Sequence, residues 1–321
     1  MGIRAPRRST IAFAAVGALA SSGSAYVGAR NFLSAQADRA RRVIPKIWEP
    51  PPRADGVYTP GGGPVERWSR GMPVDLHLMV FGDSTATGFG CHTADEVPGV
   101  LLARGLAEET GKRIRLSTKA IVGATSKGLS GQVDAMFVAG PPPDAAVIMI
   151  GANDITALNG VVPSARRLGA TVRRLRASGA VVVVGTCPDF GVISAIPQPL
   201  RWTARTRGLR LARAQAAAVR EAGGVAVPLA DLLAPEFLQA PELMFSEDKY
   251  HPSAAGYALA AKQLFPALCQ ALGEWTGGPV AEPPWVSQAA EARTIRSRLR
   301  RFTRVWRRTT GVPAPLVVPA N

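Results

Sequence analysis

The sequence has few cysteines, few aromatic residues and few histidines. Its three cysteines, Cys91, Cys187 and Cys269, form no C-x-x-C pair and no Cys/His cluster, so they encode neither a zinc site nor a disulfide scaffold. One disulfide with a leftover thiol is compatible with these positions, but we favour three reduced, buried thiols. Aromatic residues make up 6% of the chain, which argues against a carbohydrate-binding or RNA-stacking surface. Phosphate-loop and G-x-G-x-x-G patterns are also missing, so we expect no cofactor and no metal.

Acidic residues are too few to balance the basic ones, and the net charge is +15. Taken over the whole chain, this suggests a nucleic acid or an anionic membrane as partner. Residues 1–46 hold eight basic residues and one acid, and residues 287–321 hold eight arginines and one acid. The remaining 22 basic and 21 acidic residues leave residues 47–286 at +1. A nearly neutral centre argues against a nucleic-acid partner.

The chain has enough apolar residues to form a core. Its 321 residues, 47% of them hydrophobic and 19% charged, allow one large domain with appendages or two small domains, and exclude global disorder.

The N-terminal residues 1–46 predict a signal or anchor segment followed by a basic arm. Arg4, Arg7 and Arg8 precede a run without charged residues from Ser9 to Ala29, which is typical of a signal peptide or an uncleaved membrane anchor. The arginines that begin at Arg30 are unfavourable for translocation. We favour export or membrane anchoring in the cell envelope, with a cytoplasmic, membrane-peripheral protein as the alternative.

Residues 47–75 are rich in proline and glycine and predict a linker, whereas residues 76–275 predict one α/β domain. Short, continuously apolar strands alternate there with helices, which indicates a parallel sheet covered on both faces. We therefore expect a five-stranded sheet in a three-layer α/β/α sandwich. The expected strands are Leu76–Phe81, Arg113–Val122, Ala145–Ile150, Ala180–Gly185 and Val225–Pro228, and the expected helices are Val97–Thr110, Gly128–Ala139, Val162–Ala177, Arg201–Ala222 and Ser253–Leu272.

Four short blocks bring polar residues to the ends of these strands and to the last helix, where ligands bind in such sheets. They are Gly82-Asp83-Ser84-x-x-x-Gly88, the lone Gly123, Gly151-x-Asn153-Asp154 and Asp248-x-x-His251-Pro252. Each alone has an ordinary explanation, as a helix cap, a turn or a partly buried histidine. Their combination around one sheet edge indicates a catalytic site.

In this order the blocks resemble those of the SGNH (GDSL-type) hydrolases, and the resemblance covers about residues 76–272. It implies a flavodoxin-like fold with strand order 2-1-3-4-5 and a serine ester hydrolase similar to bacterial exported esterases and lipases. Ser84 is then the nucleophile, His251 its general base and Asp248 the acid that orients the imidazole. The amides of Ser84 and Gly123 and the side chain of Asn153 form the oxyanion hole.

Three other activities stay open at this stage. The same residues permit acyl transfer to an alcohol, or deacetylation of cell-envelope glycans or lipids. A non-catalytic, envelope-binding domain of the same fold has no need of Ser84, Asn153, Asp248 and His251 together, so we rank it lower.

Further polar residues near the blocks have structural interpretations. We expect His77 and Cys187 to be structural, and His92 and Cys91 to be loop residues. The Pro- and Ile-rich segment Gly191–Trp202 is our candidate for a loop that contacts the acyl group.

Residues 276–321 predict a basic tail. Between Arg293 and Arg308, eight arginines surround apolar residues at helical spacing. Such a helix either binds an anionic membrane surface or packs its apolar stripe onto the domain.

Overall fold

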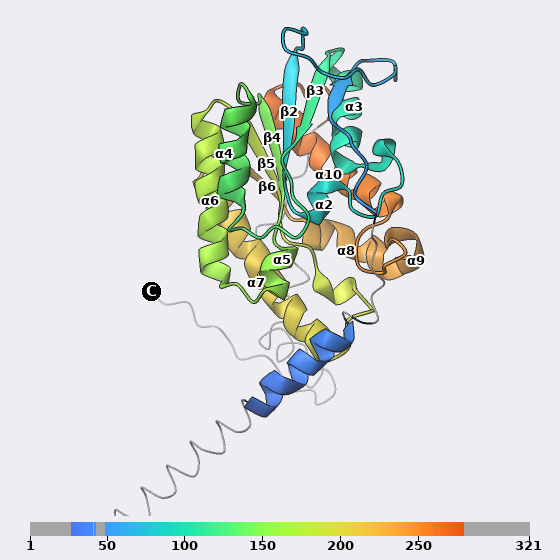
Figure 1. The fold of residues 1–321 in the computed structure, drawn as a ribbon, viewed down its shortest axis with the longest axis vertical. Coiled ribbons are helices and arrows are strands. Elements are labelled where there is room, and N and C mark those ends of the chain that lie inside the picture. Colours follow the sequence, from blue (N-terminus) through green and yellow to red (C-terminus); the bar gives the residue numbers. More distant parts are fainter. Residues whose placement is uncertain (1–26, 41, 43–48, 279–321) are drawn as a thin grey trace, which may run out of the picture.

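A mixed β-sheet forms the centre of the computed structural model, which describes residues 27–40, 42 and 49–278 (Figure 1). The strands run in the order β1-β3-β2-β4-β5-β6. Their bounds are β1 (Gly56–Tyr58), β2 (Leu76–Gly82), β3 (Ile114–Thr118), β4 (Ala145–Met149), β5 (Val181–Gly185) and β6 (Val225–Val227).

Strands β2 to β6 are parallel, and their spatial order is the expected 2-1-3-4-5. The expectation of five strands is wrong by one, because β1 adds an antiparallel edge strand beside β3. This strand lies within residues 47–75, where the Pro- and Gly-rich composition predicts only a linker. Three residues are enough to pair with Ile114–Leu116, but they are too short to give a periodic sequence signal.

Strand β3, which was predicted as Arg113–Val122, also differs from its predicted bounds. It ends at Thr118 instead of Val122, and Ile121 and Val122 are exposed in the loop that follows. A turn closed by the Ala124 amide on the Ile121 carbonyl directs the chain away from the sheet.

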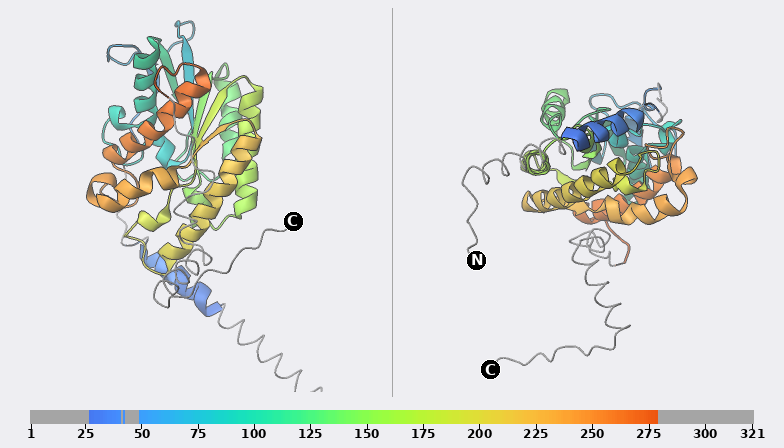
Figure 2. Two further views of the ribbon diagram at one scale, coloured as in Figure 1. Left: turned by 180° about the vertical axis from the view of Figure 1, so that it is seen from behind. Right: turned by 90° about the horizontal axis from the view of Figure 1, so that it is seen from below.

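Helices cover both faces of the sheet (Figures 1 and 2). Helices α3 and α10 lie on one face, and α4, α6 and α7 lie on the other. The longer helices are α3 (Pro98–Thr110), α4 (Leu129–Ala139), α6 (Val161–Ala177), α7 (Leu200–Glu221), α8 (Leu229–Gln239) and α10 (Ala254–Leu272), and the short ones are α2 (Ser84–Thr87), α5 (Ala152–Thr156) and α9 (Pro241–Met244). The expected three-layer architecture is confirmed.

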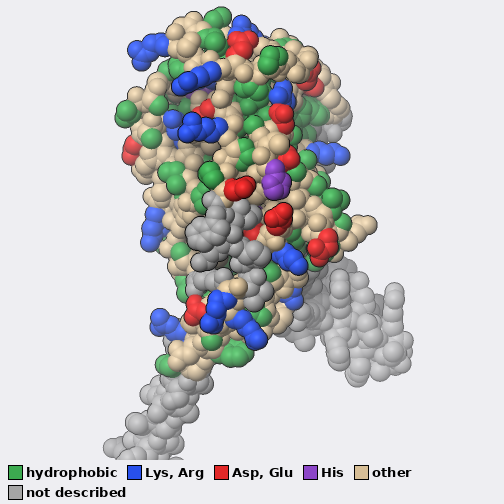
Figure 3. Space-filling model, turned by 45° about the vertical axis from the view of Figure 1, so that its right-hand side comes forward, with side chains coloured by type: hydrophobic (Ala, Val, Ile, Leu, Met, Phe, Trp, Pro, Cys, Tyr) green, Lys and Arg blue, Asp and Glu red, His purple; other side chains and the backbone are tan. Residues whose placement is uncertain are grey.

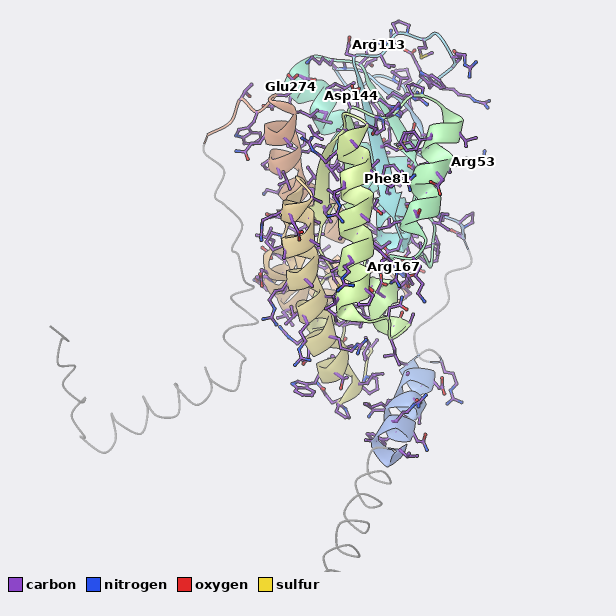
Figure 4. The ribbon with its side chains drawn as sticks, turned by 90° about the vertical axis from the view of Figure 1, so that its left-hand side faces the viewer. Arg53, Phe81, Arg113, Asp144, Arg167 and Glu274 are labelled. Atoms are coloured by element: carbon purple, nitrogen blue, oxygen red, sulfur yellow. The ribbon has the colours of Figure 1, made fainter. Side chains whose placement is uncertain are left out.

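Side chains along β2 point alternately to the two faces of the sheet, and each face has its own hydrophobic core. Leu78 and Val80 pack against α3 and α10, whereas Met79 and Phe81 pack against α4 and α6. Figure 4 shows Phe81 between the sheet and the helices of that layer. Two-sided burial is the reason that the parallel strands are continuously apolar.

All five parallel strands end at the same edge of the sheet, which is the lower edge in Figure 1. Arg113 and Asp144 lie at the opposite, upper edge in Figure 4. The loops at the lower edge therefore bring together chain segments that are far apart in sequence.

A helix at residues 27–40 lies at the lower end of the domain (Figures 1 and 2). The side chain of Gln36 bonds to the backbone there: Nε2 donates to the Gln198 carbonyl at 2.6 Å, and Oε1 accepts from the Leu200 amide at 3.0 Å. Of the predicted signal or anchor run from Ser9 to Ala29, residues 9–26 lie outside the described residues, as does the predicted basic helix at 293–308. Within the described ranges, no helix is both long and apolar enough to cross a membrane.

Candidate active site

Ser84 begins α2, directly after β2. Gly82, with φ of +135°, makes the turn possible, because a side chain at this position would overlap the carbonyl oxygen of Met149 on β4. Asp83 caps α2 by accepting hydrogen bonds from the amide and the hydroxyl of Thr85, at 3.0 and 2.7 Å. Burial raises the pKa of Asp83. The turn holds the Ser84 hydroxyl at the lower edge of the sheet.

His251 lies against this hydroxyl. Its Nε2 is 3.0 Å from Ser84 Oγ, and its Nδ1 is 2.6 Å from Asp248 Oδ2. Because Nδ1–H donates to the carboxylate, Nε2 is left to accept a hydrogen bond from Ser84. The rings of Phe89 and Tyr250 pack beside the imidazole, with centroids 4.7 and 5.1 Å away. Three residues that the sequence predicted for catalysis thus form one hydrogen-bonded chain.

The turn from Asp248 to His251 brings hydrogen-bond donors to the Asp248 carboxylate. Lys249 adopts a left-handed conformation with φ of +55°, which brings His251 back toward Asp248. Asp248 Oδ1 accepts from Ser246 Oγ and from the amides of Tyr250 and His251, at 2.8–2.9 Å. Burial alone would raise the pKa of Asp248, which is 2% exposed, but the hydrogen bonds and the nearby charge of His251 hold it below its usual range. The carboxylate is therefore ionised at neutral pH.

The three predicted oxyanion donors come from three loops of the lower edge. Gly123 has φ of +81° and is exposed after β3. Asn153 lies in α5, after β4, and its Nδ2 donates to the carbonyl of Ala124 at 3.0 Å. This bond ties the loop of Gly123 to the loop of Asn153, and leaves the second N–H of the amide for another acceptor.

Asp154 holds the same two loops together, a role that the sequence did not reveal. Its carboxylate, 1% exposed, accepts from the amide and the hydroxyl of Ser126, each at 2.8 Å. It also accepts from Asn159 Nδ2 at 2.9 Å and from Ser164 Oγ at 2.8 Å. Ser126 is three residues after Gly123, so Asp154 fixes the position of the Gly123 loop.

Gln132 on α4 is a second positioning residue that the sequence did not reveal. Its side-chain amide accepts from the Gly82 amide at 2.9 Å and donates to the Gly82 carbonyl at 2.8 Å, as a neighbouring strand would. The sequence contains a signal for this role, because Gln132 interrupts the apolar stripe of Leu129, Val133 and Met136 on α4. A glutamine in such a stripe is buried, and its amide then needs hydrogen-bond partners.

A cavity of about 90 Å³ extends from Ser84 and His251 into the domain. Most of its walls are apolar, and they come from β4, β5, α8 and α10 and from the chain after β5. Within the segment Gly191–Trp202, Val192 and Ile193 reach the cavity, while the last three residues begin α7. Other apolar wall residues are Phe190, Leu229, Leu233, Phe237 and Tyr257.

The remaining candidates take no part in the hydrogen-bonded chain of Ser84, His251 and Asp248. His77 is buried near the start of β2, where it contacts Ser117 Oγ at 2.9 Å, and burial lowers its pKa to about 4. His92 contacts Glu96 through its amide at 2.7 Å. The three cysteines are buried and unpaired. In the described residues, no group of three or more His, Cys, Asp or Glu side chains is arranged to hold a metal ion.

Comparison with known proteins adds the family. Residues 80–259 match the GDSL-like Lipase/Acylhydrolase family. The chain belongs to this family. It is 74% identical, over 279 residues, to a GDSL-like esterase of Mycobacterium tuberculosis, an alignment that covers 87% of this chain and 89% of the relative. The protein is therefore an ester hydrolase of the SGNH (GDSL-type) family, as the four sequence blocks predict.

Two solved structures are similar to the chain. One is TesA, at 22% identity and a TM-score of 0.48, covering 61% of this chain and 99% of TesA. The other is a lipase/acylhydrolase from Enterococcus faecalis, at 21% identity and a TM-score of 0.47, covering 64% of this chain and 100% of that protein.

Proposed function

We propose that the chain hydrolyses carboxylic esters through an acyl-enzyme on Ser84. His251 Nε2 takes the hydroxyl proton as Oγ attacks the ester carbonyl carbon, and returns it to the leaving alcohol. The same nitrogen then activates water, which releases the acid and restores Ser84. The observation that carries this proposal is the continuous chain from Ser84 through His251 to the buried carboxylate of Asp248.

Asp248 has two roles in this scheme. Its bond to Nδ1 fixes the tautomer in which Nε2 accepts a proton, and its negative charge stabilises the imidazolium that forms during attack. The lowered pKa of Asp248 supports both roles, because the carboxylate stays charged while His251 gains a proton.

The oxyanion that forms at the carbonyl is stabilised by the amides of Ser84 and Gly123 and by Asn153 Nδ2. Charge appears on this oxygen only during reaction, so donors that are fixed in advance lower the barrier. Asp154 and the Asn153–Ala124 bond support the proposal, since they fix two of the three donors relative to each other.

The apolar cavity is the proposed site of the acyl group. Its mostly apolar walls suit a hydrocarbon chain. The polar alcohol part of the ester then faces the lower edge, where the cavity opens beside Ser84.

A series of p-nitrophenyl esters from acetate to palmitate tests this proposal on the full chain. We expect hydrolysis of these esters by wild type, with the rates along the series giving the preferred acyl length, and no turnover above background in Ser84→Ala. A fold control by circular dichroism separates loss of the nucleophile from loss of structure. Equal rates for wild type and Ser84→Ala contradict the proposal, and added alcohol acceptors show whether the acyl group passes to an alcohol instead of water.

A further inference from the structure

Exposed apolar side chains of the described residues are concentrated at the end of the domain where the cavity opens. Ile121 and Val122 follow β3, Leu158 follows α5, and Trp202 lies in the first turn of α7. Leu243 on α9 and Phe32 on helix 27–40 belong to the same end. Large exposed apolar side chains that gather around a site mark an interaction surface more often than isolated ones do.

Hydrogen bonds connect the three chain segments that carry Phe32, Leu158 and Trp202. Phe32 lies one helical turn before Gln36, which binds the backbone of Gln198 and Leu200 just before Trp202. On the other side, Arg207 of α7 donates to the carbonyl of Asn159, next to Leu158, at 2.9 Å. Phe32, Leu158 and Trp202 are 56%, 74% and 60% exposed. We call this group the end surface.

Basic residues surround the end surface. Helix 27–40 and residue 42 carry Arg30, Arg39 and Arg42, all exposed, against the single acid Asp38. Helix α7 has no acidic residue before Glu221, and Arg210 in its first half is exposed, whereas Arg205 pairs with Asp189 and Arg207 with the Asn159 carbonyl. Figure 3 shows Lys and Arg side chains and apolar side chains together at the lower end of the molecule. Exposed aromatic residues among arginines favour an interface of apolar chains and anionic headgroups.

The sequence before helix 27–40 points to the same partner. The run from Ser9 to Ala29 contains no charged residue, and its last residues overlap the start of this helix. Because Gln36 fixes the helix at the lower end, the chain enters the described domain at the end surface. An apolar segment that associates with lipid therefore brings this end, rather than the opposite one, to the lipid.

We propose that the end surface docks onto an anionic lipid bilayer, with Phe32, Leu158 and Trp202 in the headgroup region. The cavity then opens toward the bilayer, so an acylated substrate can reach Ser84 without crossing bulk water. The docking does not depend on the catalytic roles proposed above, and it is measured with the inactive Ser84→Ala protein as well as with wild type.

A position-specific label tests the proposal in the full chain. The three native cysteines are buried, so an environment-sensitive thiol dye reports on an introduced cysteine. Leu158→Cys places the dye in the end surface. Val138→Cys, at the C-terminal end of α4 and 89% exposed at the upper end, is the matched control. Unsubstituted protein treated with the dye shows any labelling of native thiols.

With vesicles of equal parts phosphatidylcholine and phosphatidylglycerol, we expect the dye emission to shift to the blue at position 158 and to stay unchanged at 138. The shift weakens in phosphatidylcholine alone, and it weakens severalfold in Phe32→Ser but not in Val138→Ser. Absence of vesicle binding overturns the proposal. Vesicle binding with a dye shift at both positions, or at neither, also overturns the proposal. Such a result means that another segment, such as the arginine-rich residues 293–308, attaches the protein to the vesicle. An equal shift in phosphatidylcholine alone overturns the role of the arginines.

Discussion

Replacing Asp154 by asparagine tests how the oxyanion loop is held in place. The substitution keeps the shape of the side chain but turns one acceptor oxygen into an N–H₂ group. Oδ2 accepts from the backbone amide of Ser126, and Oδ1 accepts from Ser126 Oγ, Asn159 Nδ2 and Ser164 Oγ. The hydroxyls and the side-chain amide of Asn159 can turn to become acceptors, but the backbone amide of Ser126 cannot. One orientation of the new amide leaves a donor facing the Ser126 amide, and the other forces the partners of Oδ1 to reorient, so both weaken the contacts of this loop.

The expected effects follow from those contacts. A buried donor without a partner costs about 1–3 kcal/mol, so we expect the free energy of unfolding to fall by about 2 kcal/mol. Complete removal of one oxyanion donor lowers kcat by about 10²–10³. In Asp154→Asn the Gly123 amide is displaced rather than removed, and we expect kcat to fall roughly 10- to 100-fold with little change in KM.

Ser164→Ala is the matched control. Ser164 bonds to the same carboxylate from α6 but has no link to the Gly123 loop, so this variant loses stability without losing kcat. Ser126→Ala, on the loop itself, behaves like a milder Asp154→Asn. Steady-state kinetics on p-nitrophenyl butyrate and urea unfolding measure both quantities. A fully active Asp154→Asn protein with reduced stability refutes the positioning role of Asp154.

Four further variants test other parts of the structure. Gly82→Ala places a methyl group against the Met149 carbonyl, so we expect this variant to unfold at a much lower temperature. Gly131→Ala has open space around the new methyl group in α4, so its free energy of unfolding is expected to rise by about 0.5–1 kcal/mol. Thermal unfolding compares the two variants. Ala234→Phe fills part of the cavity, so kcat/KM for a hexanoyl ester falls roughly tenfold or more while the acetyl ester is barely affected. Burial lowers the pKa of His77 from 6.5 to about 4, so the unfolded chain binds more protons between these values and stability falls as pH drops through them. His77→Gln removes this contribution, and a slope of stability against pH that is identical to wild type contradicts the assignment.

The strands and most long helices could be predicted because burial on two faces leaves a direct trace in sequence. The runs Ala145–Ile150 and Ala180–Gly185 are apolar throughout, and β4 and β5 follow them to within one residue at each end. Helix α8 was not predicted, since Pro235 lies inside it and its apolar residues follow β6 closely. Strand β1 depends on pairing with β3, which is a contact across more than fifty residues and not a local pattern.

The catalytic residues of the candidate site could be predicted because they occur in short sequence blocks that are uncommon outside such sites. Ser84, Asp248 and His251 occur in short blocks whose glycine and proline neighbours indicate turns at strand ends. Asp154 and Gln132 differ from them because their roles depend on which buried backbone groups they meet in the fold. Both show that positioning residues are found from hydrogen bonds rather than from motifs.

Covalent trapping of Ser84 is the most direct test of the proposed mechanism. A p-nitrophenyl phosphonate loses nitrophenolate when an activated serine attacks phosphorus, and the phosphonyl group stays on Oγ. Peptide mass spectrometry of the full chain is expected to find one such group, on Ser84, and none on Ser84→Ala or, at matched times, on His251→Ala. A stable adduct at another residue, or equal labelling of Ser84 without His251, contradicts the mechanism.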